Sequence, residues 1–192
     1  PGSKNVIHDL QFLKSGGFAE KIGQSLDRGS EIIGICGGYQ MLGRVINDPY
    51  EIESRDGQLS GLGYLDMETV IELDKNLTRK SGVHQSSGKS IFGYEIHHGI
   101  SSMAQNPVLS FADGTFCGQM ERSGQIWGCY LHGLFDSDEF RRWFIDRLRV
   151  KAGLEPVGEI LAPYNLESAF DRLAASVREN VNMDALYRLL KI

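Results

Sequence analysis

A cysteine stands among small residues in the stretch Gly34-Ile35-Cys36-Gly37-Gly38. This stretch has the form G-x-C-x-G, a cysteine version of the sharp strand-to-helix turn that lifts a reactive side chain above a sheet edge. A thiol at the N-terminus of the following helix would feel the helix dipole, which lowers its pKa and favours the thiolate. The pattern predicts a nucleophilic Cys36, with the Gly37 N–H directed at a developing oxyanion. The alternative interpretation is that Cys36 is a small buried hydrophobic residue.

A histidine, His132, directly follows the apolar stretch 126–131 and precedes Gly133. If that stretch is a strand, His132 lies at the C-terminal edge of the sheet, where open α/β sheets place ligands. One imidazole can hold the thiol proton and then protonate a departing amine, as cysteine attack on an amide requires. A lone histidine after a strand favours a structural role, but Cys36 and His132 together favour catalysis.

The elements that must position these two residues can be predicted from hydrophobic periodicity. The β-branched run 32–35 predicts a buried strand before Cys36, and a helix follows over 39–46 until Asn47-Asp48-Pro49 ends it. Residues 5–28 predict two amphipathic helices separated by Gly16-Gly17. Further strands are expected at 61–73, 91–97, 108–111, 114–120 and 126–131, with a mobile loop at 74–90. The sheet is therefore expected to be mixed.

The C-terminal part of the sequence is predicted to be helical. Asp136 and Glu139 resemble a capping box before a helix over 137–152, which Gly153 ends. A connector over 154–165 leads to two further helices, the second with Asn182 as a possible cap. The pattern is that of one α/β domain with a helical appendage.

Composition excludes several classes of protein. The 192 residues are 41% hydrophobic, enough for one globular core. The formal net charge is −5 and the basic residues are scattered, so no nucleic-acid or anionic-lipid partner is expected. No apolar stretch approaches the roughly 20 residues that cross a bilayer, and the start lacks a signal-peptide core. We expect a cytoplasmic protein that is not bound to a membrane.

The remaining cysteines and histidines do not suggest a metal site. Cys36, Cys117 and Cys129 form no C-x-x-C pair, and His97 and His98 would point to opposite faces of a strand. Cys129 differs from His132 in strand parity and is expected to pack in the core. No metal is therefore expected in this chain.

Four blocks of the sequence resemble a known family. GICGGYQMLG at 34–43 and GCYLHGLFD at 128–136 resemble the nucleophile and histidine segments of class I glutamine amidotransferase domains. PGSKN at 1–5 and GYEIHHG at 93–99 are similar to segments of the cobyric acid synthases, ATP-dependent enzymes that amidate corrin-ring carboxylates in cobalamin biosynthesis. The resemblance spans nearly the whole chain, and four ordered blocks are far more specific than one motif.

The resemblance implies a glutaminase site. Cys36 would attack the side-chain amide of glutamine to form a thioester, and His132 would protonate the ammonia that leaves and then activate water. The Gly37 N–H and an N–H of the Gly2–Ser3 loop would hold the oxyanion. Gln40 would help to hold glutamine.

One position departs from the pattern of many class I amidotransferases. Leu134 stands where they place a glutamate that orients the histidine. The cobyric acid synthases are similar in this respect and work with a Cys-His pair. Glu95 or Asp136 is a candidate for orienting His132, although Glu95 is equally explained as a structural partner and Asp136 as a helix cap.

The resemblance also implies a domain plan. Residues 1–153 would form a three-layer, open, mixed-sheet amidotransferase domain that lacks its N-terminal strands, and residues 154–192 a helical extension packed on it. An N-terminal synthetase domain would bind ATP, magnesium and adenosylcobyrinic acid diamide, with no cofactor in this chain. The missing strands would leave an apolar sheet edge exposed, through which a dimer could form.

Two alternative functions remain open at this point. The first is the amidotransferase of another amide ligase, such as one acting on cell-wall lipid intermediates. The second is a non-catalytic interaction module of the same fold. Labelling of Cys36 by a glutamine analogue separates a catalytic domain from such a module.

Overall fold

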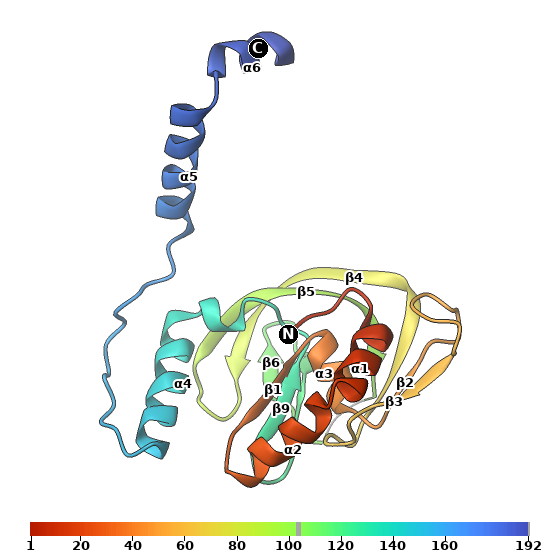
Figure 1. The fold of residues 1–192 in the computed structure, drawn as a ribbon. Helices are drawn as coiled ribbons and strands as arrows, with labels where there is room; N and C mark the ends of the chain where they lie inside the picture. Colours follow the sequence, from red (N-terminus) through yellow and green to blue (C-terminus); the bar gives the residue numbers. More distant parts are fainter. Residues whose placement is uncertain (103–104, 192) are drawn as a thin grey trace. The chain divides into compact units, whose positions relative to one another are not determined.

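The strands of the chain form two sheets, against which helices pack (Figure 1). The computed structural model describes residues 1–102 and 105–191. Contacts divide the chain into two units, Pro1–Gly158 and Glu159–Ile192. The sequence-based prediction of an α/β fold with mixed sheets is confirmed.

The smaller sheet carries the predicted nucleophile and histidine. Its order is β1 (Ile32–Ile35), β9 (Ile126–Cys129) and β8 (Gln119–Met120). Strands β1 and β9 are parallel, whereas β8 and β9 are antiparallel. Because β1 and β9 run the same way, Cys36 and His132 both follow the carboxyl ends of neighbouring strands. The topology therefore brings the two residues to one edge, as the sequence predicted.

The larger sheet is built around a long hairpin. Strand β4 (Glu68–His84) pairs antiparallel with β5 (Ser90–Ser101), with a register shift between Ile71 and Asn76. The other strands are β2 (Val45–Asn47), β3 (Gln58–Ser60), β6 (Leu109–Phe111) and β7 (Phe116–Cys117). An isolated bridge between Tyr94 and His132 joins the two sheets. This bridge lies at the candidate site.

Helices cover the sheets and close the chain. Helices α1 (Val6–Ser15) and α2 (Phe18–Asp27) confirm the two predicted near the N-terminus. The remaining ones are α3 (Gly37–Leu42), the 3₁₀ turn η1 (Leu134–Asp136), α4 (Asp138–Lys151), α5 (Leu166–Asn180) and α6 (Met183–Leu190). Asn182 caps α6 as predicted, because its side chain accepts the N–H of Ala185.

The structure corrects three local predictions. The helix after Cys36 ends at Leu42, and 45–47 form a strand that pairs with β4. The segment 74–90, predicted as a mobile loop, is mostly hairpin strand, because backbone pairing with β5 satisfies its polar groups. Asp136 lies in η1 and does not cap α4. Ser137 occupies that position, and its hydroxyl accepts the N–H of Phe92.

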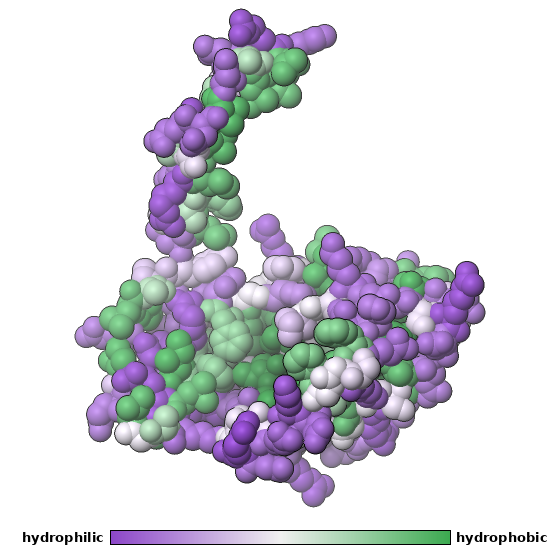
Figure 2. All heavy atoms as spheres, in the orientation of Figure 1, coloured by the Kyte–Doolittle hydropathy of each residue, from purple (hydrophilic) through white to green (hydrophobic). Residues whose placement is uncertain are grey.

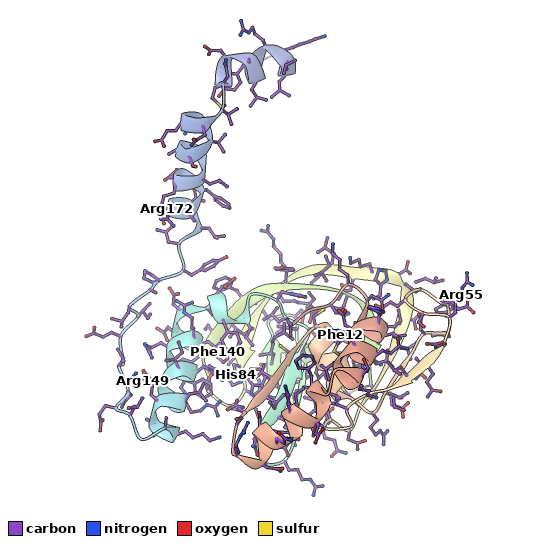
Figure 3. The ribbon with its side chains drawn as sticks, viewed as in Figure 1. Phe12, Arg55, His84, Phe140, Arg149 and Arg172 are labelled. Carbon is purple, nitrogen blue, oxygen red and sulfur yellow. The ribbon has the colours of Figure 1, made fainter. Side chains whose placement is uncertain are left out.

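A buried histidine packs against aromatic side chains of the main hydrophobic core, the larger of two clusters of buried apolar residues. His84 packs against the rings of Trp127, Phe140 and Trp143, with centroids 4.8–5.8 Å apart, and Figure 3 shows His84 next to Phe140. Its Nδ1 contacts the Ser87 hydroxyl at 2.9 Å, whereas its Nε2 is buried and has no hydrogen-bond partner among the described residues. Burial lowers the pKa of His84 to about 4. The imidazole is therefore neutral at neutral pH and acts as part of the apolar core.

Strand β1 lies at the edge of the smaller sheet. A cavity of about 440 Å³ opens beside Ile32, between α1 and α2. Its apolar walls come from Phe12, Leu13, Phe18, Ile22 and Met41. The expectation that missing strands expose an apolar sheet edge stays a prediction. Dimerisation through it stays a prediction.

The second unit is an amphipathic helical segment. The residues on one side of α5 and α6 are hydrophobic, and Figure 2 shows them gathered along one flank of these helices. Phe170, Leu173 and Leu190 are each more than half exposed. The predicted boundary at residues 153/154 and the packing of this extension on the first unit stay predictions.

Candidate active site

Cys36 occupies the sharp turn between β1 and α3. Its φ of 53° lies in the left-handed region that residues with a side chain rarely adopt. The Cys36 N–H donates to the Cys129 carbonyl at 2.8 Å, which extends the β1–β9 pairing to the turn itself. A Cβ at Gly34 would lie 2.7 Å from the Cα of Tyr39, so only glycine lets α3 fold back so closely on β1. This turn is the one that the G-x-C-x-G pattern predicted.

The first three residues of the chain lie against the start of α3. The Gly38 N–H donates to the Pro1 carbonyl at 2.9 Å, and a Cβ on Gly37 would be 2.9 Å from the Ser3 nitrogen. Gly2 is wedged between the two predicted catalytic residues. A Cβ on Gly2 would lie 3.8 Å from Cys36 Cβ and 3.8 Å from His132 Nε2. Those two atoms are therefore separated by at most twice that distance.

His132 presents a ring nitrogen with no partner. Its Nε2 is buried and forms no hydrogen bond among residues 1–102 and 105–191. A buried polar atom without a partner is costly, and in native proteins it commonly has a functional explanation. Here the free nitrogen lies on the side of Gly2 and Cys36. It is available to exchange a proton with a thiol or a bound substrate.

Tyr94, which the sequence did not single out, holds His132. The two backbones exchange hydrogen bonds, from Tyr94 N–H to the His132 carbonyl at 3.1 Å and from His132 N–H to the Tyr94 carbonyl at 2.8 Å. Their rings stack with centroids 5.1 Å apart and planes 9° apart. Tyr94 belongs to the GYEIHHG block at 93–99, which was the only sequence signal that pointed to this segment.

Neither carboxylate considered for orienting His132 contacts it in the part of the chain that the structure describes. Glu95 follows Tyr94 on β5, so its side chain points to the opposite face from the one that meets His132. Asp136 lies beside Gly133 in η1, and Leu134 is buried in the main core. The Tyr94 ring and the backbone bridge, and not an acid, therefore hold His132.

The electrostatics of the site favour neutral resting forms. Burial raises the pKa of the Cys36 thiol, and the Gly37 N–H and Lys75 offset this only in part. The expectation of a low thiol pKa is therefore wrong, because burial of the sulfur outweighs the effect of the Gly37 N–H at the start of α3. Burial lowers the pKa of His132. The thiol and the imidazole are therefore both neutral at neutral pH.

The residues predicted to hold the oxyanion lie beside Cys36, whereas Gln40 lies further along α3. The Gly37 N–H interacts with the Cys36 sulfur, and the Gly2 and Ser3 backbone lies next to it. The structure thus brings together Gly2, Ser3, Cys36, Gly37 and His132. Gln40 lies one turn further into α3 and is buried, and its Nε2 donates to the Tyr130 hydroxyl at 3.3 Å. Cys117 and Cys129 are buried, as expected for core cysteines.

The described residues form no cluster that could bind a metal ion. Within residues 1–102 and 105–191, no group of three or more His, Cys, Asp or Glu side chains could hold a metal ion. No described helix is long and apolar enough to cross a membrane.

The chain is similar to known proteins over its whole length. Residues 1–140 match the family model of the CobB/CobQ-like glutamine amidotransferase domain. The adenosylcobalamin biosynthesis bifunctional protein CobDQ of Leptospira interrogans is 44% identical over 193 residues, covering 99% of this chain and 22% of that protein. The cobyric acid synthase of Clostridium botulinum strain ATCC 19397 is 40% identical, covering 99% of this chain and 40% of that protein.

A third relative is similar to this chain to about the same degree. The cobyric acid synthase of Nitratidesulfovibrio vulgaris is 39% identical, covering 99% of this chain and 42% of that protein. This chain thus spans less than half the length of these relatives. The family model covers well over half of the chain and includes both Cys36 and His132. The chain belongs to the family of CobB/CobQ-like glutamine amidotransferase domains.

Proposed function

We propose that this domain hydrolyses glutamine through a thioester on Cys36, and that the ammonia serves ATP-dependent amidation of corrin carboxylates. The observation that carries the proposal is the buried, unpartnered Nε2 of His132, which lies with Cys36 around Gly2. Membership in an amidotransferase family supplies the substrate class. The names of the relatives supply the pathway.

The first half of the proposed reaction releases ammonia. His132 Nε2 accepts the Cys36 proton as the sulfur attacks the amide carbon of glutamine, and a C–S bond forms. The negative charge moves to the amide oxygen, where the Gly37 N–H and a Gly2 or Ser3 N–H stabilise it. The imidazolium then donates its proton to the amide nitrogen. The C–N bond breaks, and ammonia leaves behind a glutamyl thioester.

The second half regenerates the enzyme. Water occupies the place of ammonia, and His132 accepts a proton from it as the oxygen attacks the thioester carbon. The C–S bond breaks and the sulfur takes the proton back from His132. Glutamate is released. One imidazole thus acts as base, acid, base and acid in turn, which requires that it be neutral at rest, as its lowered pKa indicates.

We place the consumer of ammonia outside this chain. An N-terminal synthetase domain, with ATP, magnesium and adenosylcobyrinic acid diamide, fits the names of the relatives and the greater length of those proteins. The ligase chemistry would not involve Cys36. The Cys36→Ala variant of the full-length protein is therefore expected to lose glutamine-dependent amidation and to retain ammonia-dependent amidation.

The decisive experiment labels the thiol. A diazoketone analogue of glutamine should alkylate Cys36, with excess glutamine protecting it, and peptide mass mapping should place the adduct there. Cys117 and Cys129 serve as internal controls because they lie in β7 and at the end of β9, and not at the turn beside Gly2 and His132. An unlabelled Cys36 in folded protein would mean a non-catalytic module. Amidation of a cell-wall lipid intermediate, and not a corrinoid, by the full-length protein would replace the proposed pathway.

A further inference from the structure

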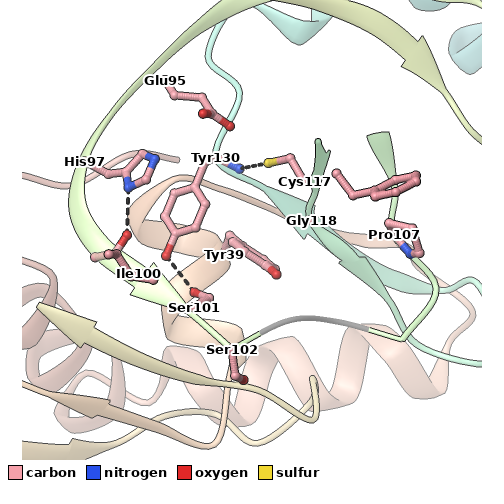
Figure 4. A pocket seen from close by; sticks show the side chains of 12 residues that line it. Tyr39, Glu95, His97, Ile100, Ser101, Ser102, Pro107, Cys117, Gly118 and Tyr130 are labelled. Atoms are coloured by element: carbon pink, nitrogen blue, oxygen red, sulfur yellow. Dashed lines mark hydrogen bonds between the residues drawn. The ribbon is translucent and has the colours of Figure 1, made fainter. Parts of the chain in front are cut away.

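We propose that a cavity beside the candidate active site binds a primary ammonium group, with the Glu95 carboxylate as its anionic partner. The cavity has a volume of about 240 Å³ and lies between β5, Tyr39 of α3 and the end of β9 (Figure 4). Its lining includes Tyr39, Glu95, His97, Ser101, Phe116 and Tyr130. The proposal rests on the proposed glutaminase function, in which both the substrate and a product carry such a group.

Glu95 is a buried acid without a cationic partner. It is only 7% exposed. Within residues 1–102 and 105–191 it forms no ion pair with a Lys, Arg or His side chain. Its contacts are the Asn76 amide nitrogen at a long 3.5 Å and the Cys117 thiol. Buried carboxylates in proteins are normally paired with a cation, so this one has an unused capacity to bind one.

Figure 4 shows the Glu95 carboxylate on the side of the cavity where Tyr130 and Cys117 lie. The neighbouring histidine does not supply the missing charge. His97 stacks on Tyr130 with centroids 3.8 Å apart, and its Nδ1 contacts the Gly99 carbonyl at 2.7 Å. Burial lowers the pKa of His97, so its ring is neutral at neutral pH. The cation must therefore come from a ligand.

The rest of the lining fits an organic ammonium better than a metal ion. The rings of Tyr39 and Tyr130 pack edge to face, 5.2 Å apart, and Phe116 adds a third ring. Aromatic faces attract ammonium groups, whereas divalent metals require several oxygen or nitrogen ligands. The cavity offers one carboxylate, and the described residues contain no metal-binding cluster. A cavity lined by one carboxylate and three aromatic rings is a site for an R–NH₃⁺ or NH₄⁺ group.

The cavity and the catalytic pair share strand β5. The carbonyl of Ile96, the residue after Glu95, lies 3.6 Å from the Cys36 sulfur. Tyr94, the residue before Glu95, stacks on His132. Glu95 thus projects into the cavity from a segment that contacts both catalytic residues on either side of it. The ligand is the α-ammonium of glutamine or the ammonium ion that the reaction releases.

The test compares glutamine with glutaramic acid, which has the same side-chain amide but no α-amino group. If the substrate supplies the ligand, Glu95→Gln raises KM for glutamine at least about tenfold and leaves that for glutaramic acid unchanged. If the product supplies it, KM stays constant but inhibition by ammonium chloride weakens by a similar factor. Glu68→Gln, an exposed carboxyl on β4, is the matched control.

A binding measurement separates this proposal from the glutaminase assignment. Methylammonium chloride is titrated at constant ionic strength into folded protein, with potassium chloride as reference, and Glu95→Asp is included to retain the charge. The cavity proposal predicts binding that Glu95→Gln abolishes and Glu95→Asp keeps in part, even if glutamine is never hydrolysed. Unchanged methylammonium binding in Glu95→Gln, or none in the native chain, would overturn it.

Discussion

Gly2→Ala tests the geometry of the catalytic pair most directly. The backbone φ of Gly2 is outside the left-handed region, so alanine is not strained there. The new Cβ would lie 3.0 Å from His132 Cε1, whereas comfortable carbon contacts are about 3.5–4.0 Å. The imidazole must therefore shift by roughly 0.5–1 Å. Because it already stacks on Tyr94, that shift also disturbs the contact that holds the ring.

A shift of this size has a predictable kinetic cost. A misplacement of about 1 Å in a catalytic group can lower the rate by roughly 10²-fold, which corresponds to about 2.7 kcal/mol of transition-state stabilisation. The loss is expected in kcat, because His132 is proposed to transfer protons and not to hold the substrate. The melting temperature should change little, since residues 1–3 contribute little to the core.

The assay is steady-state release of glutamate, with Tm measured on the same samples. Gly23→Ala is the control, because a Cβ there meets only the Tyr64 hydroxyl at an ordinary 3.6 Å. That substitution lies within α2 and should leave kcat unchanged while stabilising the helix slightly. A Gly2→Ala variant with kcat within about threefold of the native value would refute the reasoning, since 10²-fold is expected.

Three further predictions concern Cys36, Tyr94 and His84. Alkylation of Cys36 by iodoacetamide should accelerate as pH rises past the usual thiol pKa of about 8.5, because burial raises the pKa of this thiol; a plateau by pH 7 would contradict this. Tyr94→Ala should lower kcat for glutamine hydrolysis about tenfold with less effect on KM, and Tyr94→Phe should restore it by keeping the stack; equal losses would show that stacking is irrelevant. Lowering the pH from 7.5 to 5 should cost about 2 kcal/mol of unfolding free energy through His84, because its folded pKa of about 4 lies below the unfolded value near 6.5. Urea unfolding of His84→Gln should lack that part of the pH dependence.

Hydrophobic periodicity predicted the elements around the site. It failed for the segment 74–90, where pairing with another strand decides the structure. The strand 32–35 and the helices of residues 5–28 have clear periodic patterns, and the structure contains them. The segment 74–90 is polar with scattered Gly and Ser, which resembles a loop. Its β4 strand exists because β5 pairs with it along most of its length, with Leu73 and Leu77 exposed. Such pairing between the two strands of a hairpin leaves little trace in local composition.

The pair Cys36 and His132 was predictable because its evidence is topological. Two strands that end in reactive residues meet at one edge whenever they are parallel neighbours, and β1 and β9 are. Tyr94 was not predictable by this argument, since its contact arises from a bridge between two sheets. The raised thiol pKa was also missed, because burial depends on what packs over the turn, and residues 1–3 do so.

In the described part of the chain, no carboxylate lies beside His132. The pKa shifts of Cys36 and His132 explain how the site can work without one. A buried carboxylate would stabilise the imidazolium and raise the imidazole pKa, which favours a resting thiolate-imidazolium pair. Here burial lowers the imidazole pKa and raises the thiol pKa, so the pair remains neutral until substrate arrives. Charge would then develop only as sulfur attacks, when the Gly37 N–H can stabilise the oxyanion. In such a site, Tyr94 needs only to hold the ring in position, which a stack and two backbone hydrogen bonds can do without adding charge.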